Sequence, residues 1–191
     1  MSANRGKDWE DKFKELCEEQ GVQCVRFHDT LYAGKKGGDN PCDFVISRNT
    51  DEPAILIECK VSEKGSFNIK SKFKQLPRLL ELTKFKSYLV LWLTEVKKVY
   101  AFPTHRLNKL YEKGLRTISE RAIQTNPELQ DISILLTDKA KRVNPIDLNI
   151  RVLWNIIFVD KDHIKESKAT TKKEPIPEER LNYTQSIKYI C

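Results

Sequence analysis

Two short apolar runs flank a polar segment in the first third of the chain, and this pair constrains the fold more than any other stretch. Residues 44–46 and 54–57 are apolar and largely β-branched or aromatic, and both runs are too short for helices. Residues 47–53 are all turn or loop formers. The pattern predicts an antiparallel hairpin, and in such a hairpin Asp43 falls near Glu58.

The second strand of this hairpin continues into a charged pair. Glu58 and Lys60 are two residues apart, so on a strand they project from one face while Cys59 points to the other. With Asp43, the hairpin therefore gathers two carboxylates and a lysine at the ends of core strands. The alternative is an edge hairpin with a surface salt bridge, which would contribute little to stability.

Metal-assisted phosphodiester hydrolysis is the chemistry that suits this set. Mg²⁺ prefers hard oxygen ligands and is usually held by one or two carboxylates plus substrate phosphates. Asp43 and Glu58 are the candidate ligands, with the backbone carbonyl of Cys59 as a third, and we expect Mn²⁺ to substitute. Lys60 would orient or deprotonate a water, or neutralise charge on the phosphate; a cation nearby and partial desolvation can lower its pKa enough for the base role.

The stretch resembles the PD-(D/E)XK nuclease superfamily, with Pro41-Cys42-Asp43 as its first signature and Glu58-Cys59-Lys60 as its second. The resemblance implies an α/β fold with a restriction-endonuclease-like core, in which helices flank a central mixed β-sheet. It also implies a metal-dependent DNA endonuclease. The Gly-x-x-x-Glu start formed by Gly6 and Glu10 looks like the superfamily's opening helix, whose glutamate often reaches the metal, so Glu10 is a further candidate.

Within the superfamily, the chain is most similar to Holliday-junction resolvases. Ser66-Phe67-Asn68-Ile69 followed by Gln75-Leu76 is similar to the segment after Glu-x-Lys in RecU-type resolvases, which makes Gln75 a candidate active-site neighbour. The opening helix, a Val-x-x-Val-Arg strand and a Gly-rich loop look like the archaeal resolvases, and the likeness covers about residues 5–105. A restriction or homing endonuclease, or a catalytically silent DNA-binding module on the same fold, are the alternatives.

The charge balance also favours a nucleic-acid partner. The formal net charge is +7 and the pI is near 9.1, which suggests a polyanionic ligand. The ordinary alternative is a set of solvated cationic faces. The candidate DNA-binding residues are Arg26, Lys35, Lys36, Lys64, Lys70, Lys72, Lys74 and Arg78.

Several other classes of protein are disfavoured. No apolar stretch is long enough to span a bilayer, and the first residues do not resemble a signal peptide. The five scattered cysteines indicate free thiols in a reducing compartment, and hence a cytoplasmic protein; a zinc site from Cys42, Cys59 and His28 is the alternative. There is no P-loop or dinucleotide fingerprint, so we expect no nucleotide cofactor. Cutting two strands favours a homodimer.

The remaining pattern predicts a nuclease domain over residues 1–160, with a core at 5–115 and an elaboration at 116–160, followed by a basic, flexible tail at 161–191. The expected helices are at 7–20, stopped by Gly21, and at 104–113, capped by Thr104 and stopped by Gly114. Helical segments are also expected at 67–85, opened or divided by Pro77, and at 117–124. The expected strands are at 22–28, at 87–94, buried on both faces, and at 99–102, and residues 132–136 form a strand or a buried helix.

Overall fold

The computed structural model describes residues 5–27, 40–47 and 54–140. The chain divides into two units, Met1–Trp154 and Asn155–Cys191, and the second unit lies outside the described residues. Lys35, Lys36, residues 141–160 of the expected elaboration and the whole expected tail lie outside them as well. The division between domain and tail at residue 160 therefore stays a prediction.

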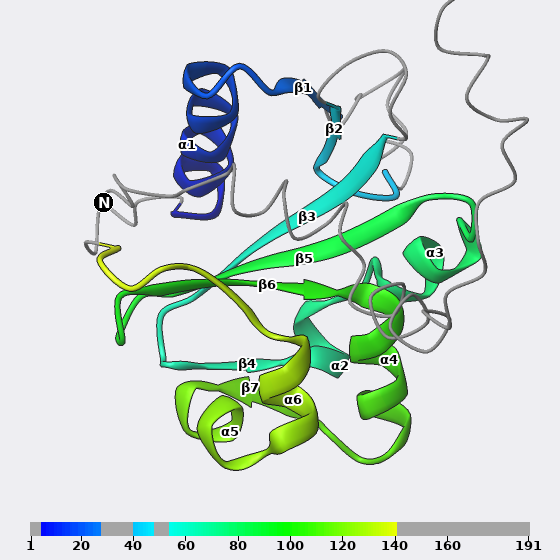
Figure 1. The fold of residues 1–191 in the computed structure, drawn as a ribbon, viewed down its shortest axis with the longest axis vertical. Helices are drawn as coiled ribbons and strands as arrows, with labels where there is room; N and C mark the ends of the chain where they lie inside the picture. Colours follow the sequence, from blue (N-terminus) through cyan, green and yellow to red (C-terminus); the bar gives the residue numbers. More distant parts are fainter. Residues whose placement is uncertain (1–4, 28–39, 48–53, 141–191) are drawn as a thin grey trace, which may run out of the picture. The chain divides into compact units, whose positions relative to one another are not determined.

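A mixed six-stranded sheet forms the centre of the described part, with helices packed against it, so the predicted α/β class is confirmed (Figure 1). The strand order is β1-β2-β3-β5-β6-β8. Only β3 and β5 pair in parallel, and every other pair in this sheet is antiparallel. The strands are β1 (Gln23–Arg26), β2 (Phe44–Ser47), β3 (Ile55–Ser62), β5 (Lys86–Leu93), β6 (Lys98–Pro103) and β8 (Ile134–Thr137).

The predicted hairpin is the β2–β3 pair. Its register places Phe44 opposite Ile57 and Ile46 opposite Ile55. The backbone N–H of Asp43 donates to the carbonyl of Ile57 at 3.1 Å, and Asp43 lies immediately before Phe44, the first residue of β2. The expectation that Asp43 falls near Glu58 is confirmed.

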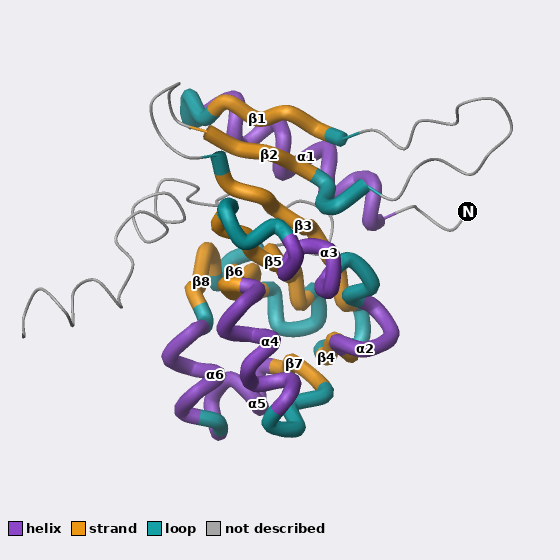
Figure 2. Tube along the Cα trace, turned by 90° about the vertical axis from the view of Figure 1, so that its right-hand side faces the viewer, coloured by secondary structure: helices purple, strands orange, loops and turns teal. Residues whose placement is uncertain are grey.

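Helices cover the sheet from opposite sides, as Figures 1 and 2 both show. Helix α1 (Arg5–Glu19) packs against β1 and β3 through Trp9, Phe13, Leu16 and Cys17, the four residues that form its predicted apolar face. It ends where Gly21 adopts a positive φ of 71°, a backbone conformation that glycine reaches without steric cost. Helix α4 (Thr104–Glu112) packs against β5 and β6 on the other side.

Strand β5 lies between these two layers and is buried at every residue except Lys86, as predicted for a central strand. On the α1 side, Trp92 contacts Trp9, with ring centroids 5.7 Å apart. On the α4 side, Leu89 and Leu91 belong to one apolar cluster that also holds Leu107 of α4. The sheet therefore separates two apolar layers.

A second, two-stranded sheet was not predicted. It joins β4 (Ser66–Asn68) to β7 (Thr117–Ser119) and buries Phe67 and Ile118 completely. The expected helical region 67–85 consists of this strand and two short helices, and the expected helix 117–124 begins as strand β7. The remaining helices are α2 (Ile69–Lys72), α3 (Leu76–Glu81), α5 (Glu120–Thr125) and α6 (Pro127–Ile132).

The helix boundaries confirm two sequence signals and correct a third. Pro77 lies in the first turn of α3, where its missing N–H costs nothing, and Gly114 follows α4 with a positive φ of 109°. The prediction that Thr104 caps α4 is wrong. Pro103 occupies the N-cap position, and the Thr104 hydroxyl instead contacts the hydroxyl of Ser87 on β5, where both residues are buried.

Strand β1 forms an edge of the sheet in the described residues and is only four residues long, shorter than expected. Val25 is 63% exposed, and Phe27, just beyond the strand, is 38% exposed. Val25 and Phe27 lie two residues apart and so share one face of the strand, but that face is not a core face. No helix in the described ranges is long and apolar enough to cross a membrane.

Candidate active site

The site begins where β2 stops pairing with β3. Beyond that point the backbone N–H of Cys59 on β3 donates to Oδ2 of Asp43 at 2.7 Å, so the carboxylate continues the hydrogen bonding where the strand pairing ends. In an antiparallel ladder the N–H and C=O of one residue face the same neighbour. The carbonyl of Cys59 therefore faces the same edge of β3 as Asp43, where it was predicted to act as a ligand.

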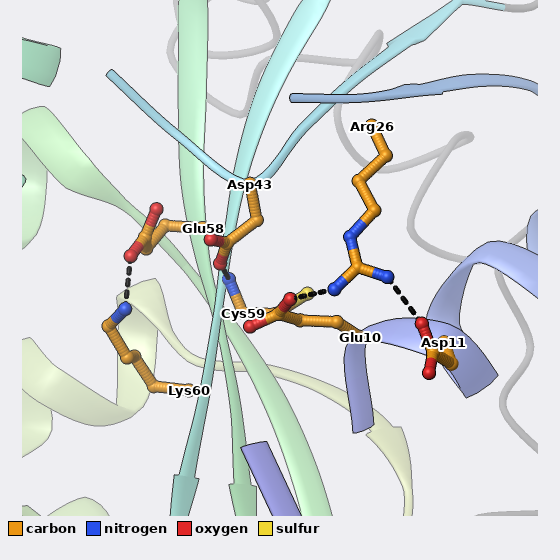
Figure 3. Close-up of polar contacts among 7 residues, drawn as sticks. All are labelled: Glu10, Asp11, Arg26, Asp43, Glu58, Cys59 and Lys60. Carbon is orange, nitrogen blue, oxygen red and sulfur yellow. Dashed lines mark hydrogen bonds and ion pairs between the residues drawn. The ribbon is translucent and has the colours of Figure 1, made fainter. Parts of the chain in front are cut away.

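Glu58 and Lys60 project from one face of β3, as expected. In the parallel pairing with β5 they lie beside Leu89 and Leu91, two residues of the apolar cluster on the α4 side. Glu58 is completely buried, and its Oε1 contacts Nζ of Lys60 (Figure 3). The other oxygen, Oε2, is buried without a hydrogen-bond partner in the described structure.

This carboxylate is costly for the fold. Burial raises the pKa of Glu58 to about 7, and the charge of Asp43 adds to the effect while Lys60 opposes it. A buried, ionised oxygen that lacks a partner destabilises a protein, so apolar side chains would serve this position better if it were purely structural. A salt bridge to Lys60 alone leaves Oε2 unsatisfied.

Lys60 is strongly held as an ammonium in this arrangement. Burial lowers its pKa, but the charges of Glu58 and Asp43 outweigh that effect, and the net pKa is raised. The lowered pKa that the base role requires is therefore not produced by these protein groups. It would need a cation that neutralises the two carboxylates.

Glu10 approaches the site from the opposite layer. It lies on α1, half-buried, and Figure 3 shows its carboxylate directed toward Asp43 and Cys59. Burial raises the pKa of Glu10, the neighbouring charge of Asp43 raises it further, and Arg26 and Lys60 oppose the shift. The structure therefore brings together Asp43, Glu58, Lys60 and Glu10, which come from three separate elements of the chain.

Arg26 lies beside this group, with its guanidinium in contact with Glu10 and Asp11 (Figure 3). We expected it to contact DNA; its two bound acids give it a different environment from that of the other candidate cations. Asp11 was not among the predicted residues. Its pairing with Arg26 joins positions 15 residues apart in the chain, and no local pattern marks such a contact.

The predicted DNA-binding cations of α2, of α3 and of the connection between them are all exposed. None of them forms a salt bridge with another residue in the described part of the chain. We call this group the α2–α3 basic surface: Lys70, Lys72, Lys74 and Arg78. Lys64, in the turn after β3, instead lines a polar cavity of about 520 Å³ with Arg5, Glu63, Thr94 and Glu95.

Gln75 occupies the N-cap position of α3, half-buried, and its side chain makes no capping hydrogen bond. Its role as an active-site neighbour stays a prediction.

Among the residues that the structure describes, no group of three or more His, Cys, Asp or Glu side chains is arranged to hold a metal ion. Four cysteines, Cys17, Cys24, Cys42 and Cys59, are free thiols, and His28 of the alternative zinc site lies outside the described residues.

No family model matches the sequence, and no curated protein matches it. Among solved structures, the chain is similar to Hjc, a Holliday junction resolvase from Archaeoglobus fulgidus, at 18% identity over 61% of this chain and 89% of that chain, with a TM-score of 0.43. It is also similar to the bacterial homing endonuclease I-Ssp6803I, at 15% identity over 87% of this chain and 99% of that chain, with a TM-score of 0.41.

Proposed function

We propose that the protein is a metal-dependent DNA endonuclease of the PD-(D/E)XK type, resembling the Holliday-junction resolvases. The observation that carries the proposal is the fully buried carboxylate of Glu58, one oxygen of which has no partner in the described structure, near the carboxylate of Asp43 at the edge of β3 where pairing with β2 ends. The two signature motifs that contain these residues support the same assignment.

The donor set fits Mg²⁺. Asp43 and Glu58 provide carboxylate oxygens and Cys59 provides a carbonyl oxygen, all hard ligands of the kind that Mg²⁺ and Mn²⁺ prefer. Two carboxylates suffice because Mg²⁺ usually retains several waters and takes substrate phosphate oxygens as well. When bound, the cation would polarise the scissile phosphate and lower the pKa of a water.

Lys60 has a separate role in this proposal. As an ammonium, Lys60 neutralises charge that develops on the phosphate oxygens as the bond to phosphorus breaks. Glu10 assists from the α1 side, next to Asp43. The α2–α3 basic surface, whose cations are exposed and free of salt bridges within the described residues, supplies the DNA backbone contacts that set most of the affinity.

The test is cleavage of a labelled four-way junction, a linear duplex and single-stranded DNA, compared in Mg²⁺ and in EDTA. We expect Mg²⁺-dependent cutting that Asp43→Asn and Glu58→Gln each abolish while DNA binding is retained. Symmetric nicking of the junction alone identifies a resolvase acting as a homodimer. Cutting of duplex at discrete sites moves the assignment to a restriction or homing enzyme.

A matched control is available on the other side of the molecule. Glu120 on α5 accepts from Lys98 and from Tyr100 on β6, and so forms a partly buried Glu–Lys pair outside the site. Glu120→Gln should leave cleavage intact. Cleavage at the normal rate by Asp43→Asn or Glu58→Gln contradicts the site assignment, and DNA binding without any cutting by the native chain favours the catalytically silent module.

A further inference from the structure

The position of Arg26 is set by the same strands that place Asp43. Arg26 is the last residue of β1 and pairs with Phe44 of β2, and the next residue, Phe27, donates its N–H to the carbonyl of Asp43 at 2.9 Å. The guanidinium lies over the Phe44 ring, with its central carbon 5.8 Å from the ring centroid. The side chain is 15% exposed, so it extends along the protein and not into solvent.

Both ends of the guanidinium are occupied by acids of α1. One terminal nitrogen donates to Oε2 of Glu10 and the other donates to Oδ1 of Asp11. A planar guanidinium offers its donors in a fixed fork, so two simultaneous contacts restrict the orientation of both partners. Asp11 is about half-exposed, whereas the side chain of Glu10 is 26% exposed and directed toward Asp43 (Figure 3).

Glu10 needs such a restraint because its other neighbour repels it. Two carboxylates that approach one another in a partly desolvated site raise each other's energy, and a glutamate on a helix surface can avoid this by rotating outward. The contact with Arg26 offsets the repulsion and keeps Glu10 directed inward. A lysine could supply the charge there, but it could not supply the fork that also contacts Asp11.

We propose that Arg26 is a positioning residue: it holds the carboxylate of Glu10 beside Asp43, so that Glu10 contributes to metal binding at the β3 edge. This inference rests on the proposed function, because it presumes a metal there. It assigns Arg26 a role inside the protein, in place of the DNA contact expected from its charge. Outer partners of metal-binding groups typically contribute about 10- to 100-fold to metal affinity.

A double-mutant cycle on metal affinity tests the inference without relying on cleavage. Mn²⁺ binding to the full chain is measured by electron paramagnetic resonance for the native protein, Arg26→Gln, Glu10→Gln and the double variant. We expect each single substitution to weaken binding by about tenfold, the lower end of that range. The double variant should bind no more weakly than Glu10→Gln, because Arg26 acts through Glu10.

Additive losses in the cycle, or native Mn²⁺ affinity in Arg26→Gln, would overturn the proposal. Arg106→Gln is the matched control, because it removes another Arg–Asp pair, that of Arg106 with Asp131 at 2.6 Å between α4 and α6, and it should leave Mn²⁺ affinity unchanged. If Arg26→Gln does not fold, as judged by circular dichroism, Arg26→Lys replaces it in the cycle, with a smaller expected loss.

DNA affinity without metal separates this role from a phosphate contact. Arg26→Gln should bind duplex as the native protein does, whereas removal of a cation that binds phosphate would weaken binding and reduce the salt slope by about one. Such weakening would overturn the inference. If the four proteins give the expected Mn²⁺ affinities but the native protein cuts no DNA, only the proposed function is contradicted. If the native protein binds no Mn²⁺, the proposed function and the role of Arg26 are both overturned.

Discussion

The acidic site at the β3 edge and the α2–α3 basic surface both carry charge without a full set of counter-charges, but at very different cost. Glu58 is completely buried with one unpartnered oxygen, whereas Lys70, Lys72 and Lys74 are exposed to water. Burying an ion costs several kcal/mol after relaxation, while a solvated surface lysine costs almost nothing. Only the buried charge therefore requires an explanation beyond stability.

The comparison divides the expected phenotypes as well. Changes at the acidic site should act on chemistry, metal affinity and the pH dependence of stability. Changes on the basic surface should act on DNA affinity alone. If a change at the acidic site altered only DNA affinity, or a change on the basic surface altered metal affinity, the two regions would not have the separate roles assigned to them.

Among substitutions that leave the carboxylates in place, Lys60→Met should have the largest effect on the cleavage rate. In the proposed function the ammonium stabilises charge that develops only in the transition state, and loss of one such group typically lowers the rate about 10²- to 10³-fold. Single-turnover cleavage and DNA binding, measured together, check this. Equal losses in rate and in affinity would instead place Lys60 with the DNA-binding cations.

Glu58→Gln should change how stability depends on pH. The folded pKa of Glu58 is raised from its ordinary 4.5 to about 7, so the folded state holds this proton more tightly than the unfolded state. The contribution of this bound proton to the free energy of unfolding is fully present below pH 4.5 and is lost as pH rises to about 7. Without metal at pH 8, the variant should therefore be more stable than the native protein, by up to about 3 kcal/mol.

Urea unfolding between pH 4 and pH 8 in EDTA measures this difference. Saturating Mg²⁺ should reverse the order at pH 8, because only the native site gains stability from the ligand. A native protein whose stability does not change between these pH values, with Glu58→Gln parallel to it, would show that the buried carboxylate does not titrate in this window.

The smallest expected effect belongs to the basic surface. Substituting Lys70, Lys72 and Lys74 together by alanine should weaken DNA binding and lower the salt slope by about 0.9 for each phosphate that the protein no longer neutralises. The cleavage rate at saturating DNA should not change, because none of the three lies among the residues at the β3 edge. Fluorescence anisotropy over a salt series checks the affinity. An unaltered slope would exclude this surface as the DNA-binding face.

Local sequence patterns predicted much of the site. The hairpin that brings Asp43 near Glu58 depends on two adjacent strands and a short connection, so its register follows from the chain itself. The pairing of β4 with β7 could not be foreseen, because it joins three-residue strands about 50 positions apart with no periodic signal.

The environments of Arg26 and Thr104 show the same limit. The prediction that Arg26 contacts DNA used its charge alone. The packing of α1 against β1 places Glu10 and Asp11 beside Arg26, and local sequence does not reveal that packing. Thr104 was expected to cap its own helix, yet packing of α4 on β5 places its hydroxyl against Ser87. Thr104 had a local and a distant partner available, and tertiary structure selects the distant one. Arg26 has acidic partners only because tertiary structure brings α1 to β1.

The contact between Trp9 and Trp92 has a spectroscopic consequence. Trp9 precedes Glu10 on α1, and its ring is 5.7 Å from that of Trp92 in the sheet, where both are buried. These are two of the three tryptophans in the chain, so a Trp154→Phe variant would confine the indole emission to this pair. Their emission maximum would then report whether α1 is seated on β5, and hence whether Glu10 is at the site, with no label attached.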